Sequence, residues 1–398
     1  MSLSYPSLNT LEDAQDWSYV GEGNQNIVVR YIGSNVIFRR KVLRIAKTHH
    51  NPHDSVDDAD VIFQLKFIED VIKPLIGNEY VIHMVPVKTT ETFLAALAQR
   101  IEQYRPAHRL KGQILVRAPT SFLMQDLTQL WTRPTLPTIK DAQINPEITK
   151  NTDAFTIELK PKWGFKPSAS NIHSIKTKYC RFCMHAHMRK FDIHAYCPLD
   201  LYSNDQKRLK KALDALLDQP ILRQKTLKIT PQQSNFERDK LQDILLNILL
   251  KDPILCKLKN LQKKLDSVDI ENIIKLYKPG ITIGNDIRPW KVAIANYINR
   301  QSTENSVEEK LYKYVLSMTF KDCSIMINVA TTTQADIEEN SEVKYVTIGT
   351  GNLYKYDVKL IDIDLKKIEK IPHWYELDKS IVQYAVDTKF SKKSPCEE

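Results

Sequence analysis

Glycine is scarce in this chain of 398 residues, and long apolar runs are absent. Only 10 glycines occur, so glycines that stand close together mark places where the backbone needs tight geometry. No apolar run approaches the ~18 residues that span a bilayer. The N-terminus also has no basic stretch followed by an apolar core. We therefore expect neither a membrane protein nor a secretory signal.

The overall composition fits an ordinary soluble globular protein, with 42% hydrophobic and 26% charged residues. The chain is too long for one hydrophobic core, which predicts two lobes. The formal net charge of +9 indicates either a basic surface kept for solubility or a polyanionic partner, such as nucleic acid or a polyphosphorylated small molecule. Charge alone does not decide between these.

The order of the predicted elements indicates an α+β protein. Residues 17–47 contain the β-branched runs of a hairpin, residues 56–76 have helical spacing, and two more strand-like runs follow. We assign residues 1–127 to a small β-rich N-terminal lobe. Residues 128–398 form a larger, mixed C-terminal lobe.

Helical patterns dominate the larger lobe, and strand-like runs return near its end. Ser203 followed by Gln206 predicts a capping box before a helix. Two polar stretches, residues 221–235 and 331–342, are predicted to be mobile insertions.

The first candidate site is a glycine-containing segment between two predicted strands. It consists of Gly21, Glu22, Gly23, Asn24, Gln25 and Asn26. Two glycines let the backbone approach a phosphate, and backbone N–H groups there can hold its oxygens. An ordinary hairpin turn would explain the same residues. Arg44 in the next predicted strand is either a salt-bridged residue or a ligand of nucleotide phosphates.

The second candidate is the strand-like segment around Glu158. Period-two alternation places Glu158, Lys160 and Lys162 on one face, and a proline between the two lysines ends the strand. Two lysines and a glutamate that project together suit a site that handles phosphates. A solvated strand face is the alternative.

The third candidate is a pair of carboxylates near the C-terminal end of the chain. Asp362, Asp364 and Lys366 share one face of a predicted strand. Mg²⁺ bound to a nucleotide usually takes one or two carboxylates and phosphate oxygens, while Lys366 would neutralise a substrate phosphate. Asp322, at the boundary of another strand, is a further candidate acid. A solvated edge strand and a turn residue are the respective alternatives.

The fourth candidate is a cluster of cysteines and histidines. Cys183 and His187 lie four residues apart on one face of a predicted helix, and with Cys180 and Cys197 they predict a tetrahedral structural Zn²⁺ site. His185 and His194 compete with His187 for the fourth position, and reduced core cysteines remain an alternative.

Taken in order, these motifs resemble those of the inositol-pentakisphosphate 2-kinase family over residues 16 to about 378. The most specific segments of the resemblance are E-L-K-P-K and C-P-L-D-L-Y-S, accompanied by G-E-G-x-x-N, V-L-R-I, L-M-x-D-L-T, C-R-F-C-M-H-x-H, K-D-C-S-I-M-I and L-I-D-I-D-L-K.

The resemblance implies a bilobal kinase-like fold that binds ATP and Mg²⁺ and phosphorylates the 2-hydroxyl of inositol 1,3,4,5,6-pentakisphosphate. Carried over by motif, the nucleotide would be held by Gly21, Glu22, Gly23, Asn24, Gln25, Asn26, Arg44, Gln125, Asp126 and Glu158. The substrate would be held by Arg109, Lys160, Lys162, Lys366 and Lys370. Asp322 and Lys160 would be catalytic, and Asp362 would bind Mg²⁺.

The chain also departs from the family pattern. Cys183 stands where some members have a lysine, Lys370 and Trp374 stand where some have arginine and tyrosine, and the asparagine-rich loop near residues 227–229 is missing. Arg109 is preferred to Arg105 as the arginine that reaches substrate from the small lobe.

The competing function is a basic, zinc-containing nucleic-acid-binding protein without catalytic activity. It leaves the E-L-K-P-K and I-D-I-D-L-K segments unexplained, and no aromatic stacking motif supports it. We therefore expect a monomer that binds a small-molecule substrate, with neither nucleic acid nor membrane as a partner. The family implies nuclear residence, and the cytoplasm is the alternative.

Overall fold

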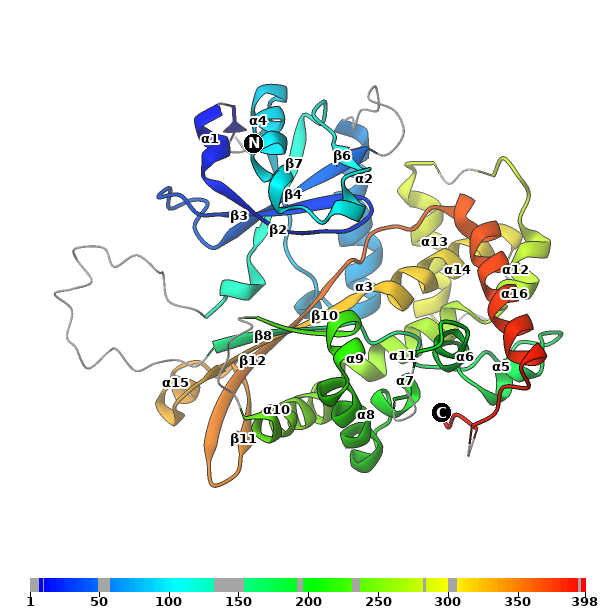
Figure 1. Ribbon diagram of the computed structural model, residues 1–398. Coiled ribbons are helices and arrows are strands. Elements are labelled where there is room, and N and C mark those ends of the chain that lie inside the picture. Colours follow the sequence, from blue (N-terminus) through cyan, green and yellow to red (C-terminus); the bar gives the residue numbers. More distant parts are fainter. Residues whose placement is uncertain are drawn as a thin grey trace. The chain divides into compact units, whose positions relative to one another are not determined.

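The computed structural model in Figure 1 describes residues 7–9, 11–48, 58–131, 154–191, 196–230, 237–281, 284–299, 306–392 and 395–398. The chain divides into two compact units. The first comprises Met1–Phe67 and Ile82–Leu130, and the second comprises Ile68–Val81 and Trp131–Glu398. The sequence assigned the whole of 1–127 to the first lobe, whereas the structure gives residues 68–81 to the second unit.

The first unit is built on a seven-stranded sheet whose neighbours, apart from one parallel edge pair, run antiparallel. The strand order is β1 (Ser7–Leu8), β5 (Val85–Thr89), β7 (Thr120–Gln125), β4 (Lys41–Thr48), β3 (Asn26–Tyr31) and β2 (Trp17–Glu22), with β6 (Gln113–Ile114) paired to β4. Alternation in β3 buries Ile27, Val29 and Tyr31 and leaves the residues between them partly exposed. These side chains form one core with Trp17.

Helix α4 (Glu91–Ile101) covers this core in the first unit. Its buried residues Phe93, Leu94, Leu97 and Ile101 recur at helical spacing. Thr90 caps its N-terminus, because the Thr90 side chain accepts a hydrogen bond from the Phe93 N–H at 3.2 Å. The remaining helices of the unit are α1 (Leu11–Gln15), α2 (Asp58–Phe67) and the 3₁₀ turns Glu102–Tyr104, Ala107–Arg109 and Leu127–Gln129.

The second unit contains a five-stranded antiparallel sheet. Its order is β11 (Lys344–Ile348), β12 (Asn352–Ile361), β10 (Ser324–Thr331), β8 (Ala154–Leu159) and β9 (Leu227–Thr230). Leu159 pairs with Ile325, and Ser324 pairs with Ile361. The carboxyl ends of β8 and β12 therefore meet the start of β10 at one end of the sheet.

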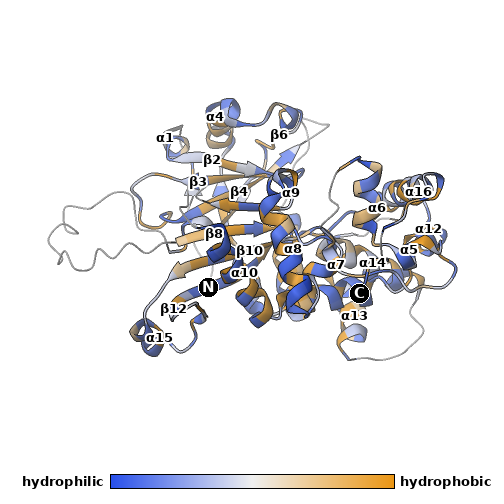
Figure 2. Ribbon diagram, turned by 60° about the horizontal axis from the view of Figure 1, so that its bottom comes forward, coloured by the Kyte–Doolittle hydropathy of each residue, from blue (hydrophilic) through white to orange (hydrophobic). Residues whose placement is uncertain are grey.

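Helices make up most of the rest of the second unit. They are α3 (Lys73–Ile76), α5 (Ile175–Lys178), α6 (Arg181–Met188), α7 (Pro198–Leu201), α8 (Gln206–Asp218), α9 (Pro220–Lys225), α10 (Arg238–Lys251), α11 (Ile254–Leu265), α12 (Ile270–Leu276), α13 (Ile287–Ile298), α14 (Val307–Asp322), α15 (Gln334–Glu339) and α16 (Ile371–Asp387). Figure 2 shows both polar and apolar colouring along α8, as its buried Leu209, Leu213 and Leu216 require.

The α+β class is confirmed, and three local features differ from what the sequence patterns indicated. Residues 221–235 include all of α9 except its first residue and the whole of β9, which pairs with β8. Residues 231–235 of this stretch lie outside the described residues. Residues 331–342 include α15, whose capping box joins Thr333 and Asp336. Asp205, and not Ser203, caps α8, because the Asp205 carboxylate accepts the Arg208 N–H. Within the described part of the chain, no helix is both long and apolar enough to cross a membrane.

Candidate functional site

The glycine turn of the first unit joins β2 to β3. The N–H of Gly23 donates to the carbonyl of Asn26 at 2.9 Å, and the N–H of Lys47 donates to the carbonyl of Gln25 at 2.8 Å. A Cβ added at Gly21 or Gly23 would meet nothing within 4 Å. Packing within the unit therefore does not require these glycines, and their lack of a side chain leaves the turn backbone open to a ligand.

The carboxylate of Glu22 is used inside the protein. It is 1% exposed and pairs with the ammonium group of Lys47 and with Arg105, whose Nε and Nη2 lie 2.8 and 2.9 Å from its two oxygens. Burial opposes the charge on Glu22, but the hydrogen bonds from Arg105 and Lys47 outweigh it and lower the pKa of Glu22. The Glu22 carboxylate therefore anchors the turn, and a nucleotide contact at this residue would use its backbone N–H.

The two candidate arginines, Arg105 and Arg109, differ in whether their side chains are used inside the protein. Arg105 is buried, and besides Glu22 its Nη2 donates to the carbonyl of Arg109 at 3.0 Å. Arg109 is partly exposed, and its Nη1 donates to Oδ1 of Asn24 in the glycine turn. Arg109 thus presents its guanidinium beside the turn, whereas Arg105 is committed to the interior.

Arg44 and the end of β7 complete the first unit's candidates. Arg44 is half-buried on β4, with Nη1 3.8 Å from Sδ of Met84. The Asp126 carboxylate is buried and accepts hydrogen bonds from Arg30 and from Thr128. The backbone N–H of Asp126 donates to the carbonyl of Arg40 at 2.9 Å. Gln125 is likewise held, with its Oε1 3.2 Å from the Nζ of Lys41. The side chains of Gln125 and Asp126 shape the chain turn after β7, which leaves a nucleotide contact there to the backbone.

The second unit brings together Glu158, Lys160, Ser324 and Asp362, here called the Lys160 cluster. The Nζ of Lys160 lies 3.0 Å from Oγ of Ser324, 3.2 Å from Oε1 of Glu158 and 3.7 Å from Oδ2 of Asp362. Ser324 in turn donates to Glu158 at 3.2 Å. These residues come from the adjoining ends of β8, β10 and β12, so the sheet register sets their spacing.

Electrostatics in the Lys160 cluster favour the charged forms of its central pair. Burial opposes both charges, yet Glu158 raises the pKa of Lys160, and Lys160 lowers the pKa of Glu158. Asp362 is different, because its partial burial, together with Asp364 and Glu158, raises its pKa against the influence of Lys160. Since 54% of the Asp362 side chain is exposed, a bound cation can still reach it.

Asp322 and Lys366 form a second pair at this end of the unit. The Nζ of Lys366 lies 2.8 Å from Oδ2 of Asp322, whose side chain is 70% exposed at the end of α14. Lys162 is half-buried, and burial together with nearby Lys160 lowers its pKa. Lys370 lies exposed at the end of a 3₁₀ turn (Ile368–Lys370).

Two of these residues have unusual backbone conformations. Lys162 has φ of 65° and Asp362 has φ of 61°. Residues other than glycine adopt this left-handed region at a cost of about 1–3 kcal/mol, which the surrounding structure must supply. Asp362 directly follows the end of β12, and Lys162 lies three residues after the end of β8.

Lys228 is a residue that the sequence reasoning missed. It lies opposite Glu158 in the β8–β9 register, with its Nζ 3.6 Å from Oε2 of Glu158. The alternating segment Leu227–Thr230 was the available signal, but a strand there was not expected. The exposed Lys228 adds a cation to this face of the sheet.

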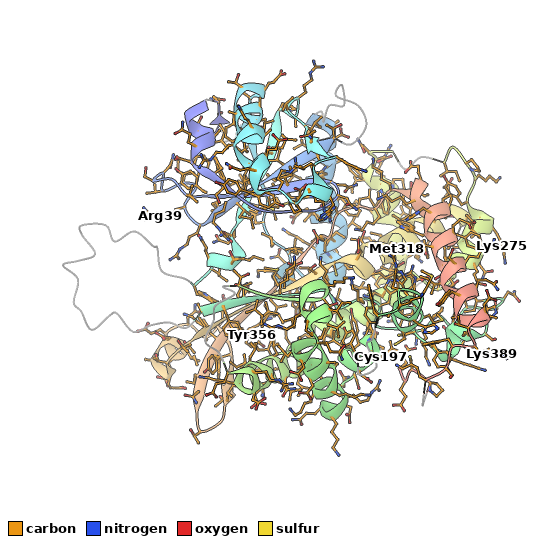
Figure 3. All side chains as sticks on the ribbon, viewed as in Figure 1. Arg39, Cys197, Lys275, Met318, Tyr356 and Lys389 are labelled. Carbon is orange, nitrogen blue, oxygen red and sulfur yellow. The ribbon has the colours of Figure 1, made fainter. Side chains whose placement is uncertain are left out.

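The cysteine group lies elsewhere in the second unit. The Sγ atoms of Cys180, Cys183, Cys197 and Cys396 all lie within 4.8 Å of one another, and all four residues are buried. Figure 3 labels Cys197, whose Sγ is 3.7 Å from that of Cys180. Four thiols at this spacing match the ligand set of a structural zinc site.

The prediction that His187 is the fourth zinc ligand is wrong. Its Nε2 lies 2.9 Å from Oγ1 of Thr388, and its ring packs against Phe390. His185 is also outside the group, since its Nε2 accepts from Arg189 at 3.3 Å. His194 lies outside the described residues. Cys396 takes the position instead, and its N–H donates to the carbonyl of Lys178 at 3.0 Å.

The second unit therefore has the features of a phosphate-handling site, with carboxylates that suit a hard metal ion and lysines around them. The chain matches the family described as inositol-pentakisphosphate 2-kinase over residues 19–380. A protein of that name from Danio rerio is 27% identical, covering 94% of this chain and 93% of its own. Those from Arabidopsis thaliana and Cryptococcus neoformans var. neoformans are 26% and 28% identical, covering 94% and 96% of each chain.

The match extends over most of the chain and over most of each relative. This chain belongs to the inositol-pentakisphosphate 2-kinase family.

Proposed function

We propose that this protein transfers the γ-phosphoryl group of ATP to the 2-hydroxyl of inositol 1,3,4,5,6-pentakisphosphate, giving inositol hexakisphosphate (phytate) and ADP. The observation that carries the proposal is the convergence of Glu158, Lys160 and Asp362, with the Asp322–Lys366 pair, in a chain that belongs to this family. Phosphoryl transfer needs positioned charges more than covalent chemistry by the protein.

Asp322 is the proposed acceptor of the hydroxyl proton. Its exposed carboxylate at the end of α14 is accessible to a bound alcohol, and a general base needs hydrogen-bond reach before it needs a shifted pKa. As the new bond forms between the alcohol oxygen and the γ-phosphorus, the bond to the β–γ bridging oxygen breaks. The proton passes to Asp322, and the electron pair leaves with ADP.

Lys160 is proposed to neutralise charge on the phosphoryl group in flight. It is anchored by Ser324 and Glu158, so its ammonium group does not need to reorganise during the reaction. Asp362 would hold Mg²⁺, since carboxylate oxygens are the protein ligands that this ion prefers. When bound, that ion would neutralise the nucleotide phosphates.

In the second unit, the inositol phosphates are assigned to Lys162, Lys366 and Lys370. The family resemblance adds Arg109 as a further candidate ligand of the substrate. Each cation that pairs with one substrate phosphate is left unpaired by a substrate that lacks this phosphate, which costs binding energy. The glycine turn and Arg44 are assigned to the nucleotide phosphates, which backbone N–H groups and a guanidinium both suit.

A structural Zn²⁺ is proposed for the four cysteines. All four are free of disulfides and buried, and thiolates are the ligands that closed zinc sites use. Nuclear residence and a monomeric state remain predictions, which imaging of a tagged chain and sedimentation can test.

The deciding experiment is transfer from radiolabelled ATP to inositol 1,3,4,5,6-pentakisphosphate with Mg²⁺. Wild type, Asp362→Ala and Asp243→Ala are compared, because Asp243 is an exposed aspartate on α10 of the same unit. Product from wild type and Asp243→Ala, but not from Asp362→Ala, is expected. No product from folded wild type would refute the proposal, and product from Asp362→Ala at a normal rate would remove Asp362 from the metal site.

A further inference from the structure

A single buried amide links two of the candidate segments of the second unit. Gln262 lies on α11 and is 0% exposed. Its Oε1 accepts the N–H of Gly164 at 2.8 Å, and its Nε2 lies 3.0 Å from the carbonyl oxygen of Lys162 and 2.9 Å from that of Phe320. One side chain thus holds backbone groups that lie far apart in the sequence.

The chemistry of these partners fixes the orientation of the amide. Carbonyl oxygens only accept and a backbone N–H only donates, so the NH₂ must face Lys162 and Phe320 while the oxygen faces Gly164. Both N–H groups of the amide are then used. The hydroxyl of Tyr202 adds a donor to the same Lys162 carbonyl at 3.1 Å.

Both ends of the link are places that need external support. Lys162 has a left-handed backbone with φ of 65°, and its carbonyl and the Gly164 N–H flank the same short turn. Phe320 lies in the last turn of α14, where carbonyl groups have no partner within the helix. Asp322 follows two residues later, so Gln262 holds the helix end that carries the proposed base.

A second contact connects the chain just after α11 to the same two segments. The carboxylate of Asp266 pairs with the buried ammonium group of Lys321, which lies 4.2 Å from the ring centroid of Trp163. Asp266 is the residue that directly follows the end of α11. Gln262 and Asp266 therefore contact the segments that contain Lys162 and Asp322 from the C-terminal end of α11.

We propose that Gln262 is a positioning residue that fixes the Lys162 turn relative to the end of α14 that carries Asp322. The inference rests on the proposed function, in which Lys162 binds a substrate phosphate and Asp322 accepts the proton of the hydroxyl group. A displacement of about 1 Å between such groups can lower a rate about 100-fold. Gln262 touches neither reactant and acts through the backbone of both segments.

The test compares Gln262→Leu with Gln242→Leu. Gln242 is a matched control because it is 1% exposed in the same unit, and its amide bonds with Lys210, Asp214 and Arg238 instead. Both variants lose a buried amide, so both should lower Tm. Only Gln262→Leu should lower kcat, about 10- to 100-fold, with a raised KM for inositol pentakisphosphate and an unchanged KM for ATP.

Gln262→Glu provides a second readout if the leucine variant does not fold. A protonated glutamic acid can accept from Gly164 and donate to one carbonyl, whereas the ionised form can only accept. The kcat of Gln262→Glu should therefore fall as pH rises through the pKa of the new carboxyl group, and Gln242→Glu should follow the wild-type pH profile.

The outcomes separate the two proposals. Wild type that transfers no phosphate refutes the proposed function. Active wild type with equal kcat in Gln262→Leu and Gln242→Leu, or with no added pH dependence in Gln262→Glu, overturns the positioning role and leaves the function intact.

Discussion

The Nζ of Lys160 lies 3.7 Å from Oδ2 of Asp362, although the two residues belong to motifs at opposite ends of the second unit's sequence. The contact arises because β8 and β12 both flank β10 and have their carboxyl ends at the same end of the sheet. The carboxylate proposed to bind Mg²⁺ and the lysine proposed to bind phosphate are thereby placed on a rigid framework. The proposed chemistry depends on this spacing, and each prediction below alters one part of the site or its support.

Asp322→Asn should lower kcat about 100- to 10,000-fold, the range typical of a lost general base. Asparagine keeps the shape of the side chain but does not accept the proton. Calorimetry should show that affinity for inositol pentakisphosphate is retained or raised, because asparagine no longer holds Lys366 in an ion pair. Asp243→Asn is the matched control. A kcat close to wild type for Asp322→Asn would remove Asp322 from the mechanism.

Arg105→Ala and Arg109→Ala should differ in kind. Removing Arg105 leaves the buried Glu22 short of a partner, which should cost about 3–5 kcal/mol of unfolding free energy. Removing Arg109 should leave Tm almost unchanged and raise the KM for inositol pentakisphosphate about tenfold, as expected for one lost charge-assisted contact. Thermal unfolding and steady-state kinetics on both variants provide the comparison, and equal effects on Tm would contradict the assignment.

Acid should destabilise the first unit through Glu22. The pKa of Glu22 in the folded protein is below its ordinary value of 4.5, so the folded state binds fewer protons than the unfolded state near that pH. The stabilisation is complete above pH 4.5 and is lost as pH falls through the lowered pKa. Glu22→Gln should be less stable at pH 7 and show a flatter acid dependence. If the free energy of unfolding of Glu22→Gln fell in parallel with that of wild type throughout the acid range, the role assigned to Glu22 would be contradicted.

Cys396→Ser should lose zinc as completely as Cys180→Ser. Three thiolates without the fourth leave an open position, which weakens a structural site. The zinc content, measured by elemental analysis, and the Tm should fall together in both variants. Cys256→Ser, at an exposed cysteine, and His187→Ala should keep full metal content. Zinc retained by Cys396→Ser but lost by His187→Ala would restore the histidine as the ligand.

Local sequence patterns predicted most elements around the site but not how they are joined. Alternation around Glu158 correctly indicated the strand β8, because a half-buried strand shows its period directly. The strand predicted to carry Asp362, Asp364 and Lys366 on one face is wrong, because β12 ends at Ile361 and Asp362 has a left-handed backbone. The antiparallel pairing of both strands with β10 is a long-range property that no local window contains. For the same reason, Lys228 was missed when Leu227–Thr230 was taken for part of an insertion.

The fourth zinc ligand was predicted wrongly, and the internal role of the Glu22 side chain was not foreseen, for a related reason. Cys180, Cys183 and Cys197 are close in sequence, whereas Cys396 reaches them through the C-terminal segment after α16. Glu22 stands in a motif that resembles a phosphate loop, yet its side chain turns inward to Arg105. The direction of a side chain at a bulged strand end depends on partners that arrive from elsewhere in the fold.

If Lys366 binds a substrate phosphate as proposed, its ion pair with Asp322 would make substrate binding an exchange of partners. A phosphate that attracts Lys366 would take this lysine away from the aspartate, and the aspartate would then become free for the hydroxyl group of the substrate. A ligand with too few phosphates leaves the proposed base neutralised by its own lysine. The same pair would therefore keep the resting enzyme from activating water and would couple recognition of the polyphosphate to the release of the base.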